Sequence, residues 1–167
     1  SHILETGVEV SDLKIPTQED GRFPVALGAT RRLVEKFGDQ VAIYGLITGP
    51  FTLALHLKGT DIFYDMIDEP EAVEELMAFC QKVAMQTAKM YLDAGVDVVA
   101  LVDPMTSQIS RDNFEEFVAP YAAAVFDYIH ERGKLGSMFV CGDATRNIEP
   151  MCKIHCDNLC IDENVDL

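Results

Sequence analysis

Four short apolar runs recur along the chain, and a longer stretch with helical spacing separates each run from the next. The runs cover residues 41–47, 96–102, 135–140 and 158–161 and are rich in aliphatic and β-branched side chains. Their length favours buried strands, and the stretches between them are long enough for crossover connections. The sequence therefore predicts an α/β fold with about four parallel strands and crossover helices.

The stretches between the runs carry helix signals. Pro24 and Pro50 suit first helical turns, and Gly38, Gly59 and Gly95 follow the last helical residues. Helices are predicted over residues 24–37, 50–58, 70–94, 111–132 and 148–155. Within 111–132 we expect a kink before Pro120, because proline lacks an N–H and clashes with the preceding turn. Residues 1–22 show no helix or strand pattern, so we expect an irregular N-terminal segment there.

The composition bounds the class of protein. The chain has 167 residues, 49% of them hydrophobic, which predicts a single domain with a real core over 1–167. Its 13 Lys and Arg against 28 Asp and Glu give a net charge of −15, which argues against nucleic-acid and membrane-surface binding. Five cysteines, an odd number, argue against a disulfide framework and predict a reducing, cytoplasmic setting.

Polar side chains follow the apolar runs at the points where the predicted strands end. They are Thr48, Asp103, Cys141 with Asp143, and Asp162. In parallel α/β folds the site lies at the carboxyl ends of the strands, so we expect these groups to share one rim. The alternative is that a strand end is simply where the chain meets water.

Two of these positions have competing interpretations. Asp103 is either a carboxylate that orients a substrate or takes a proton, or a cap for the loop amides before Pro104. His56, on the helix over 50–58, is either catalytic or a packed residue at the rim. A second group is most simply interpreted as small apolar packing, because its spacing is not that of a zinc knuckle: Cys152, His155, Cys156 and Cys160.

Several motifs in order resemble the uroporphyrinogen decarboxylase superfamily. They are Gly49-Pro50-Phe51-Thr52-Leu53-Ala54, the strand ending in Asp103, residues 110–121, and Phe139-Val140-Cys141-Gly142. The resemblance covers about residues 12–167. That superfamily includes the decarboxylase of haem synthesis and the methylcobamide:coenzyme M and related corrinoid methyltransferases. The resemblance implies a (β/α)₈ barrel, which takes roughly 250 residues, so the chain is expected to be a partial TIM-type barrel.

The resemblance also implies a branch and a possible metal. In the methyltransferase branch a His-x-Cys pair at a strand end binds zinc; Cys141 matches the cysteine, but Phe139 occupies the histidine position. An acid near the next strand end, Asp162 or Glu163, would complete such a shell. The decarboxylase has a tyrosine where His56 stands and a serine where Pro104 stands, which disfavours that branch.

Three functions follow as hypotheses. The first is corrinoid-dependent methyl transfer from a methylcobamide, with zinc and a corrinoid implied and a corrinoid protein as partner. The second is decarboxylation of a tetrapyrrole, which needs no cofactor. The third is an inactive fragment or paralogue that self-associates as a homodimer through open strand edges. Asp103 and His56 are the predicted catalytic residues, Cys141 and Asp162 the predicted metal ligands, and the predicted substrate-binding residues are Thr48, Phe51, Thr106, Ser107 and Asp143.

Overall fold

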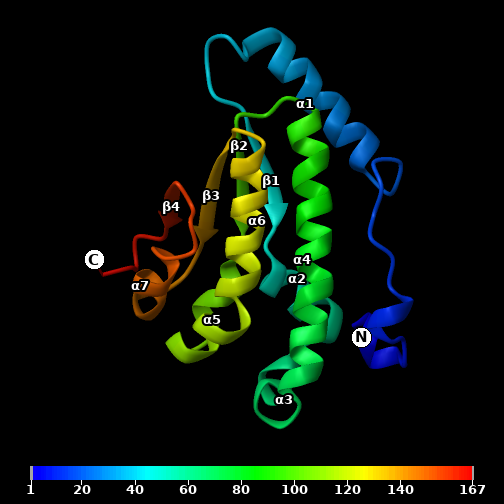
Figure 1. Cartoon of the computed structure of the whole chain (residues 1–167), viewed down its shortest axis with the longest axis vertical. Helices are drawn as coiled ribbons and strands as arrows, with labels where there is room; N and C mark the ends of the chain where they lie inside the picture. Colours follow the sequence, from blue (N-terminus) through cyan, green and yellow to red (C-terminus); the bar gives the residue numbers. More distant parts are fainter. Residues whose placement is uncertain (1, 167) are drawn as a thin grey trace.

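The computed structural model describes residues 2–166, and its centre is a four-stranded parallel sheet (Figure 1). The strands are β1 (Tyr44–Thr48), β2 (Val98–Val102), β3 (Leu135–Val140) and β4 (Asn158–Ile161), in the order β1-β2-β3-β4. The short apolar runs thus form strands, and each connection between them is long enough to bring the chain back for a parallel neighbour. The α/β fold, a partial TIM-type (β/α)₈ barrel with four parallel strands and crossover helices, is confirmed.

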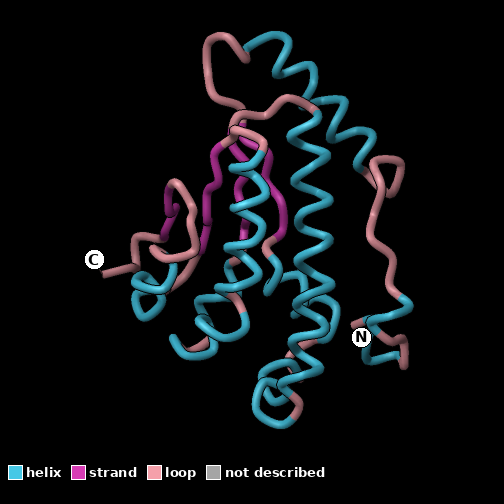
Figure 2. Tube along the Cα trace, viewed as in Figure 1, coloured by secondary structure: helices cyan, strands magenta, loops and turns pink. Residues whose placement is uncertain are grey.

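Helices cover one face of this sheet. The long helices α4 (Pro70–Asp93) and α6 (Ala119–Glu131) lie over it, and α1 (Phe23–Phe37) crosses the upper end of α4 (Figures 1 and 2). The remaining helices are α2 (Pro50–Lys58), α3 (Ile62–Asp68), α5 (Arg111–Phe117) and α7 (Ile148–Met151). No helix among residues 2–166 has the length and apolar character that a membrane crossing requires.

The two faces of the sheet differ in burial. In β1, Gly45 and Ile47 point toward the helices and are buried, whereas Tyr44 and Leu46 point to the other face and are 49% and 61% exposed. Leu135 and Phe139 of β3 lie on that same uncovered face, at 53% and 37% exposure. The core therefore lies between the sheet and its helices. On the second face, which we call the inner face, these large side chains are exposed, whereas Val98, Ala100 and Ser137 in the middle of the sheet are buried.

The predictions for the first two strands began too early in the sequence. β1 begins at Tyr44 rather than at Val41, because pairing with β2 starts at the Tyr44–Val98 row and Val41 is 58% exposed. β2 begins at Val98 rather than at Val96, whose backbone N–H instead donates to Tyr91 O at the end of α4. The predictions for β3 and β4 are confirmed at both ends.

The helix predictions need three corrections. The expected kink before Pro120 lies at Val118, where φ is −118°, and it divides the predicted helix 111–132 into two helices, α5 and α6, although the N–H of Val118 still donates to Phe114 O. α3 was not predicted at all. The predicted helix 148–155 is a 3₁₀ turn over Thr145–Asn147 followed by the short α7, which ends before His155 adopts a left-handed φ of 67°.

The amino-terminal segment also differs from the prediction. Two short 3₁₀ helices, Ile3–Thr6 and Val10–Asp12, lie within residues that were expected to be irregular throughout. The first is anchored on α2, since the Nδ1 atom of His2 lies 2.9 Å from the carbonyl oxygen of His56. Residues 1 and 167 lie outside the described part of the chain.

Close packing between β3 and α6 gives a prediction. A Cβ at Gly136 would lie 2.4 Å from Cδ1 of Phe126, a fully buried ring. We expect Gly136→Ala to lower the free energy of unfolding by about 1–3 kcal/mol, because an overpacked core must shift. Gly28→Ala is the matched control: it lies in α1 with nothing within 4 Å and should raise stability by about 0.5–1 kcal/mol. Urea unfolding of both variants measures this, and a stable Gly136→Ala protein would contradict it.

Candidate functional site

The ends of the four strands lie side by side at one edge of the sheet. Thr48 pairs with Val102, Val102 with Phe139, and Phe139 with Cys160. Because Val140 pairs with Ile161, the next residues, Cys141 and Asp162, come off neighbouring strands at the same level. The structure thus brings the strand-end residues predicted from the sequence to one rim.

Asp103 is the most buried carboxylate of this rim. It is 0% exposed, and its oxygens accept hydrogen bonds from the backbone N–H of Phe51 at 3.2 Å and of Thr52 at 2.7 Å. The hydroxyl of Thr52 donates a third, at 2.6 Å. Burial raises the pKa of Asp103 to about 6, against the opposing effect of these hydrogen bonds. Asp103 therefore caps the first turn of α2, from the neighbouring strand.

The same network joins two loops. The Thr52 hydroxyl oxygen accepts the backbone N–H of Met105 at 3.2 Å, and the hydroxyl of Thr106 donates to Asp103 O at 2.7 Å. A Cβ at Gly49 would lie 2.3 Å from Oδ2 of Asp103, so only glycine lets the β1 loop approach this closely. The loop after β1 and the loop after β2 are thereby fixed to each other.

Cys141 lies in a turn held from both sides. Its neighbour Gly142, at φ 86°, donates its N–H to Oδ2 of Asp162 at 3.0 Å. A Cβ at Gly142 would lie 3.1 Å from Oγ of Ser107, which places the β2 loop on the other side. The Cys141 thiol is exposed. The N–H of Gly142 is the main cause that lowers the pKa of Asp162, so this carboxylate is ionised at neutral pH.

The other predicted site residues differ in accessibility. Thr48 and Asp143 are exposed, and hydrogen bonds from Thr145 lower the pKa of Asp143. Thr106 and Ser107 are buried, and the Ser107 hydroxyl donates to Pro104 O at 2.8 Å. These side chains therefore reach the rim to different extents.

Two predicted residues lie away from the rim surface. Phe51 is fully buried in the core, with its ring centroid 6.4 Å from that of Phe63. His56 is exposed in the last turn of α2, and its imidazole makes no hydrogen bond or ion pair to the described residues of the rim. The structure does not bring the His56 side chain and Asp103 into contact.

Sequence reasoning missed Asn147, which is 0% exposed. Its Nδ2 donates to Thr106 O at 2.9 Å and to Ile109 O at 3.2 Å, so it ties the loop after β3 to the loop after β2. An asparagine in a polar loop carries no signal of such a role. The predicted packing of the cysteine group is wrong for Cys152 and His155, which are exposed. The other two are half-buried: burial raises the pKa of Cys156 to about 11, and Cys160 Sγ lies 3.6 Å from Ser137 Oγ.

The described residues do not fit a zinc ion. Residues 2–166 contain no group of three His, Cys, Asp or Glu side chains placed to hold a metal. Phe139 offers no donor atom, and both oxygens of Asp162 are engaged, Oδ2 by Gly142 and Oδ1 by Asn164 Nδ2 at 2.8 Å. Zinc typically takes four ligands, so Cys141 with Asp162 is an incomplete set.

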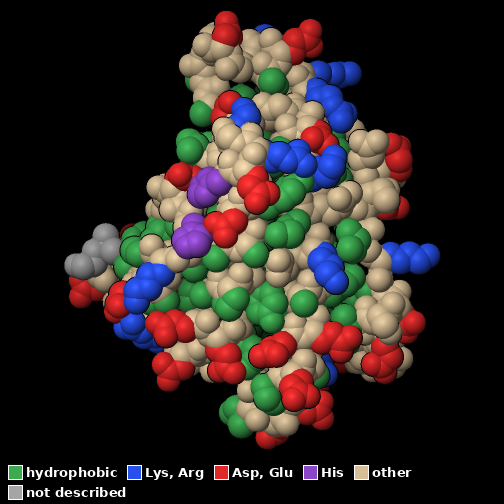
Figure 3. Space-filling model, in the orientation of Figure 1, with side chains coloured by type: hydrophobic (Ala, Val, Ile, Leu, Met, Phe, Trp, Pro, Cys, Tyr) green, Lys and Arg blue, Asp and Glu red, His purple; other side chains and the backbone are tan. Residues whose placement is uncertain are grey.

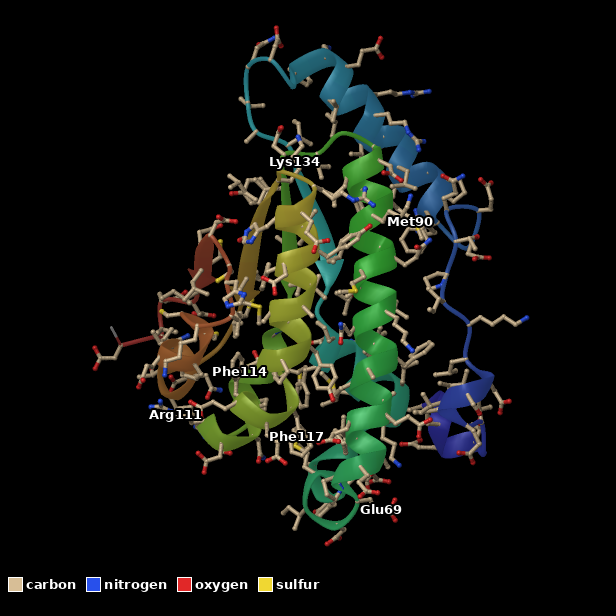
Figure 4. The ribbon with its side chains drawn as sticks, in the orientation of Figure 1. Glu69, Met90, Arg111, Phe114, Phe117 and Lys134 are labelled. Atoms are coloured by element: carbon tan, nitrogen blue, oxygen red, sulfur yellow. The ribbon has the colours of Figure 1, made fainter. Side chains whose placement is uncertain are left out.

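Acidic side chains gather at the end of the molecule toward which the strands point (Figure 3). Arg111, at the start of α5 beside α7, is engaged there by Glu149 at 2.6 Å and Glu115 at 3.0 Å (Figure 4). Arg111 is the main cause that lowers the pKa of Glu149 to about 2. The surroundings of the rim are therefore mostly negative.

A partial (β/α)₈ barrel with polar groups on its carboxyl-terminal rim defines the class as a TIM-barrel-type chain. The whole chain, residues 1–167, matches the family model "Uroporphyrinogen decarboxylase (URO-D)". The chain belongs to the uroporphyrinogen decarboxylase family.

Relatives within this family carry two different names. The chain is 29% identical to the methylcobamide:CoM methyltransferase MtbA of Methanosarcina acetivorans, over 99% of this chain and 50% of that protein. It is 30% identical to a uroporphyrinogen decarboxylase of Mycolicibacterium gilvum, over 86% of this chain and 42% of that protein. The fold resembles that of a methyltransferase from Methanosarcina mazei, with a TM-score of 0.80 and 23% identity over 90% of this chain and 45% of that one. The chain thus spans about half the length of the curated relatives it matches.

Proposed function

We propose that the chain carries part of the active site of a corrinoid-dependent methyltransferase that acts on a thiol. The observation that carries the proposal is the exposed Cys141 thiol at the end of β3, level with Asp162 and next to the Ser107 loop. The similarity to MtbA over 99% of the chain supports it. The five free cysteines of the described residues support a reducing, cytoplasmic setting.

A methylcobamide bound at the rim would be the methyl donor of such a reaction, and the thiolate of the acceptor would take the methyl group after its proton has gone to solvent. The chain's own contribution is to position groups. Asp162 holds the Cys141 turn through Gly142, and Asp103 holds the loops that present Thr48 and Thr106. Cys141 contributes a sulfur on the side of the site where the acceptor thiol binds.

The prediction is that Cys141→Ser lowers the rate of methyl transfer from methylcobalamin to coenzyme M at least tenfold. A serine hydroxyl is far less acidic and less polarisable than a thiol, so it does not replace the sulfur that Cys141 contributes beside the acceptor thiol. Anaerobic spectroscopy of cob(I)alamin formation measures the rate. Cys152→Ser is the matched control, since Cys152 is also exposed but follows α7 and not the end of a strand; it should stay within twofold of the parent protein.

Decarboxylation of a tetrapyrrole is the second candidate, supported by relatives named uroporphyrinogen decarboxylase at 23–30% identity. The same preparations distinguish the two. Consumption of uroporphyrinogen without methyl transfer would replace the first proposal by the second. Binding of neither methylcobalamin nor uroporphyrin would contradict both and favour an inactive, self-associating chain.

A further inference from the structure

We propose that Asn147 is a positioning residue for the Cys141 thiol: it holds the loop after β2 against the loop after β3 and thereby fixes the turn that carries Cys141. This role belongs to the site of the proposed methyl transfer, and it rests on the proposed function only where methyl transfer itself is measured. Three observations carry it: the burial of Asn147, the two carbonyl groups that its side chain binds, and the contact of the β2 loop with Gly142.

A polar side chain joins each pair of neighbouring rim loops. Asp103 joins the loops after β1 and β2, and Asp162 joins the turn after β3 to the end of β4. Between them, Asn147 joins the loops after β2 and β3, with Nδ2 donating to Thr106 O at 2.9 Å and to Ile109 O at 3.2 Å. Asn147 is thus the tie between the buried Asp103 network and the turn after β3.

The amide of Asn147 binds the carboxyl end of a 3₁₀ helix in the β2 loop, Pro104–Gln108. Carbonyl groups at the end of a short helix have no partner within that helix, and Nδ2 supplies a donor to each of the two that it contacts. The segment of Asn147 is fixed as well, because its backbone N–H donates to Ala144 O at 2.8 Å and Ala144 is fully buried. The 3₁₀ helix therefore cannot shift along the rim without breaking buried hydrogen bonds.

The acceptor half of the same amide has no partner. Among the buried side-chain nitrogen and oxygen atoms of residues 2–166, Oδ1 of Asn147 alone makes no hydrogen bond. Asn147 is 0% exposed, and a buried acceptor without a partner destabilises a fold. An asparagine at this position is therefore explained by the two hydrogen bonds that it donates to the β2 loop, and not by a fully satisfied amide.

The 3₁₀ helix supports the Cys141 turn from one side. It contains Ser107, whose Oγ would lie 3.1 Å from a Cβ at Gly142, the residue next to Cys141. Ser107 is itself held, since its hydroxyl donates to Pro104 O at 2.8 Å. On the other side, the N–H of Gly142 donates to Asp162. A shift of the 3₁₀ helix would leave this last hydrogen bond to hold the turn alone.

The placement of the thiol depends on this turn. The Cys141 thiol is exposed, so its position is set by the backbone that carries it rather than by packing around the sulfur. A displacement of about 1 Å in a group that positions reactants can lower a rate about 100-fold. Asn147 is buried and reaches no substrate, so it acts on the reaction only through the turn. Its loss should lower kcat for methyl transfer more than it changes KM for the acceptor thiol.

Amide hydrogen exchange, resolved by residue with NMR, tests the role in the protein itself. In Asn147→Asp a carboxylate replaces the donor that faces two carbonyl oxygens, so the N–H of Gly142 should exchange at least tenfold faster than in the parent protein. Gly136 is the internal control, because its N–H also donates to an aspartate but at the other end of β3; its exchange should stay within twofold. Equal acceleration at both glycines would show a general loss of stability and overturn the proposal, as would unchanged exchange at Gly142.

Two further variants separate the lost hydrogen bonds from the added charge. Asn147→Leu removes the donors at similar volume and without a charge, and it should also accelerate exchange at Gly142 at least tenfold. Asn113→Asp adds a carboxylate in the first turn of α5, where a helix favours negative charge, and should leave Gly142 within twofold of the parent protein. Slow exchange in Asn147→Leu, or fast exchange in Asn113→Asp, would assign the effect to charge and overturn the proposal.

A kinetic measurement separates this role from the proposed function. In methyl transfer from methylcobalamin to coenzyme M, Asn147→Leu should lower kcat at least tenfold and change KM for coenzyme M less than threefold. A kcat equal to that of the parent protein, in a variant whose Gly142 N–H exchanges faster, would overturn the proposal. A parent protein that transfers no methyl group contradicts the proposed function alone, and exchange at Gly142 then decides whether Asn147 holds the turn.

Discussion

Replacing Asp103 by alanine is expected to lower the free energy of unfolding by about 3–4 kcal/mol at pH 7. The change leaves three buried donors without their acceptor: the backbone N–H groups of Phe51 and Thr52 and the hydroxyl of Thr52. Each buried, unsatisfied group costs about 1–3 kcal/mol, and the desolvation of the lost carboxylate offsets part of the sum. The loss of the α2 cap acts in the same direction.

Urea unfolding at pH 7 measures this effect. Asp143→Ala is the matched control, because Asp143 is an exposed carboxylate of the same rim whose partner is the neighbouring Thr145. It should change stability by less than about 1 kcal/mol. An Asp103→Ala protein as stable as this control would show that the buried network does not hold the two loops.

The second large effect is a pH dependence caused by Asp103. Its pKa is about 6 in the folded chain, against an ordinary value of 3.8. Between these values the folded chain keeps a proton that the unfolded chain has lost, so stability falls as the pH rises through the window. Asp103 should thus contribute about 2 kcal/mol more at pH 4 than at pH 7, since most of the window between the two pKa values lies in that range and each unit of pKa corresponds to about 1.4 kcal/mol.

The measurement is a series of urea unfolding curves from pH 4 to pH 7 on the parent protein and on Asp103→Asn. In the difference between the two proteins' free energies of unfolding, the contributions of the other carboxylates cancel. Asp157→Asn is the control of opposite sign. The N–H of Gly136 and then His130 lower the pKa of Asp157, so its contribution is lost on acidification. Parallel curves for the parent protein and Asp103→Asn would contradict the raised pKa.

The sheet and the alignment of its strand ends at one edge were predictable. Both follow from the lengths of the apolar runs and from the parallel direction of the strands. Four short apolar runs joined by helical stretches admit few arrangements other than parallel strands. Residues that directly follow such strands must then meet at one edge. This is why Cys141 and Asp162 could be placed together, although 20 residues separate Gly142 from Asp162 in the chain.

The partners of individual rim residues were not predictable. Asp103 was expected to orient a substrate or to cap the amides before Pro104, but it accepts from Phe51 and Thr52, about 50 residues earlier. The residues around an aspartate in the sequence do not indicate which loop lies close to its side chain in the fold. For the same reason Phe51 was expected at the surface of the site, whereas its ring packs in the core against Phe63.

The missed helix α3 has a local cause. Asp61 precedes it, but its side chain makes no capping hydrogen bond, and the helix has only seven residues. Its stability comes from contacts of Ile62 and Met66 with the core, which a capping signal does not reveal. Tertiary packing thus decides a segment whose intrinsic preference is weak.

Aspartates tie the strands in pairs, at both ends. Before β2, Asp97 accepts the N–H of Ile43, as Asp103 does for the residues after β1. The second pair repeats this pattern, with Asp157 bound to Gly136 and Asp162 to Gly142. In each pair the acceptor belongs to the strand that is synthesised later, so the earlier strand stays without its terminal ties while the ribosome is still producing the next helix. During synthesis, the terminal hydrogen bonds of the sheet should therefore form for one pair of strands at a time.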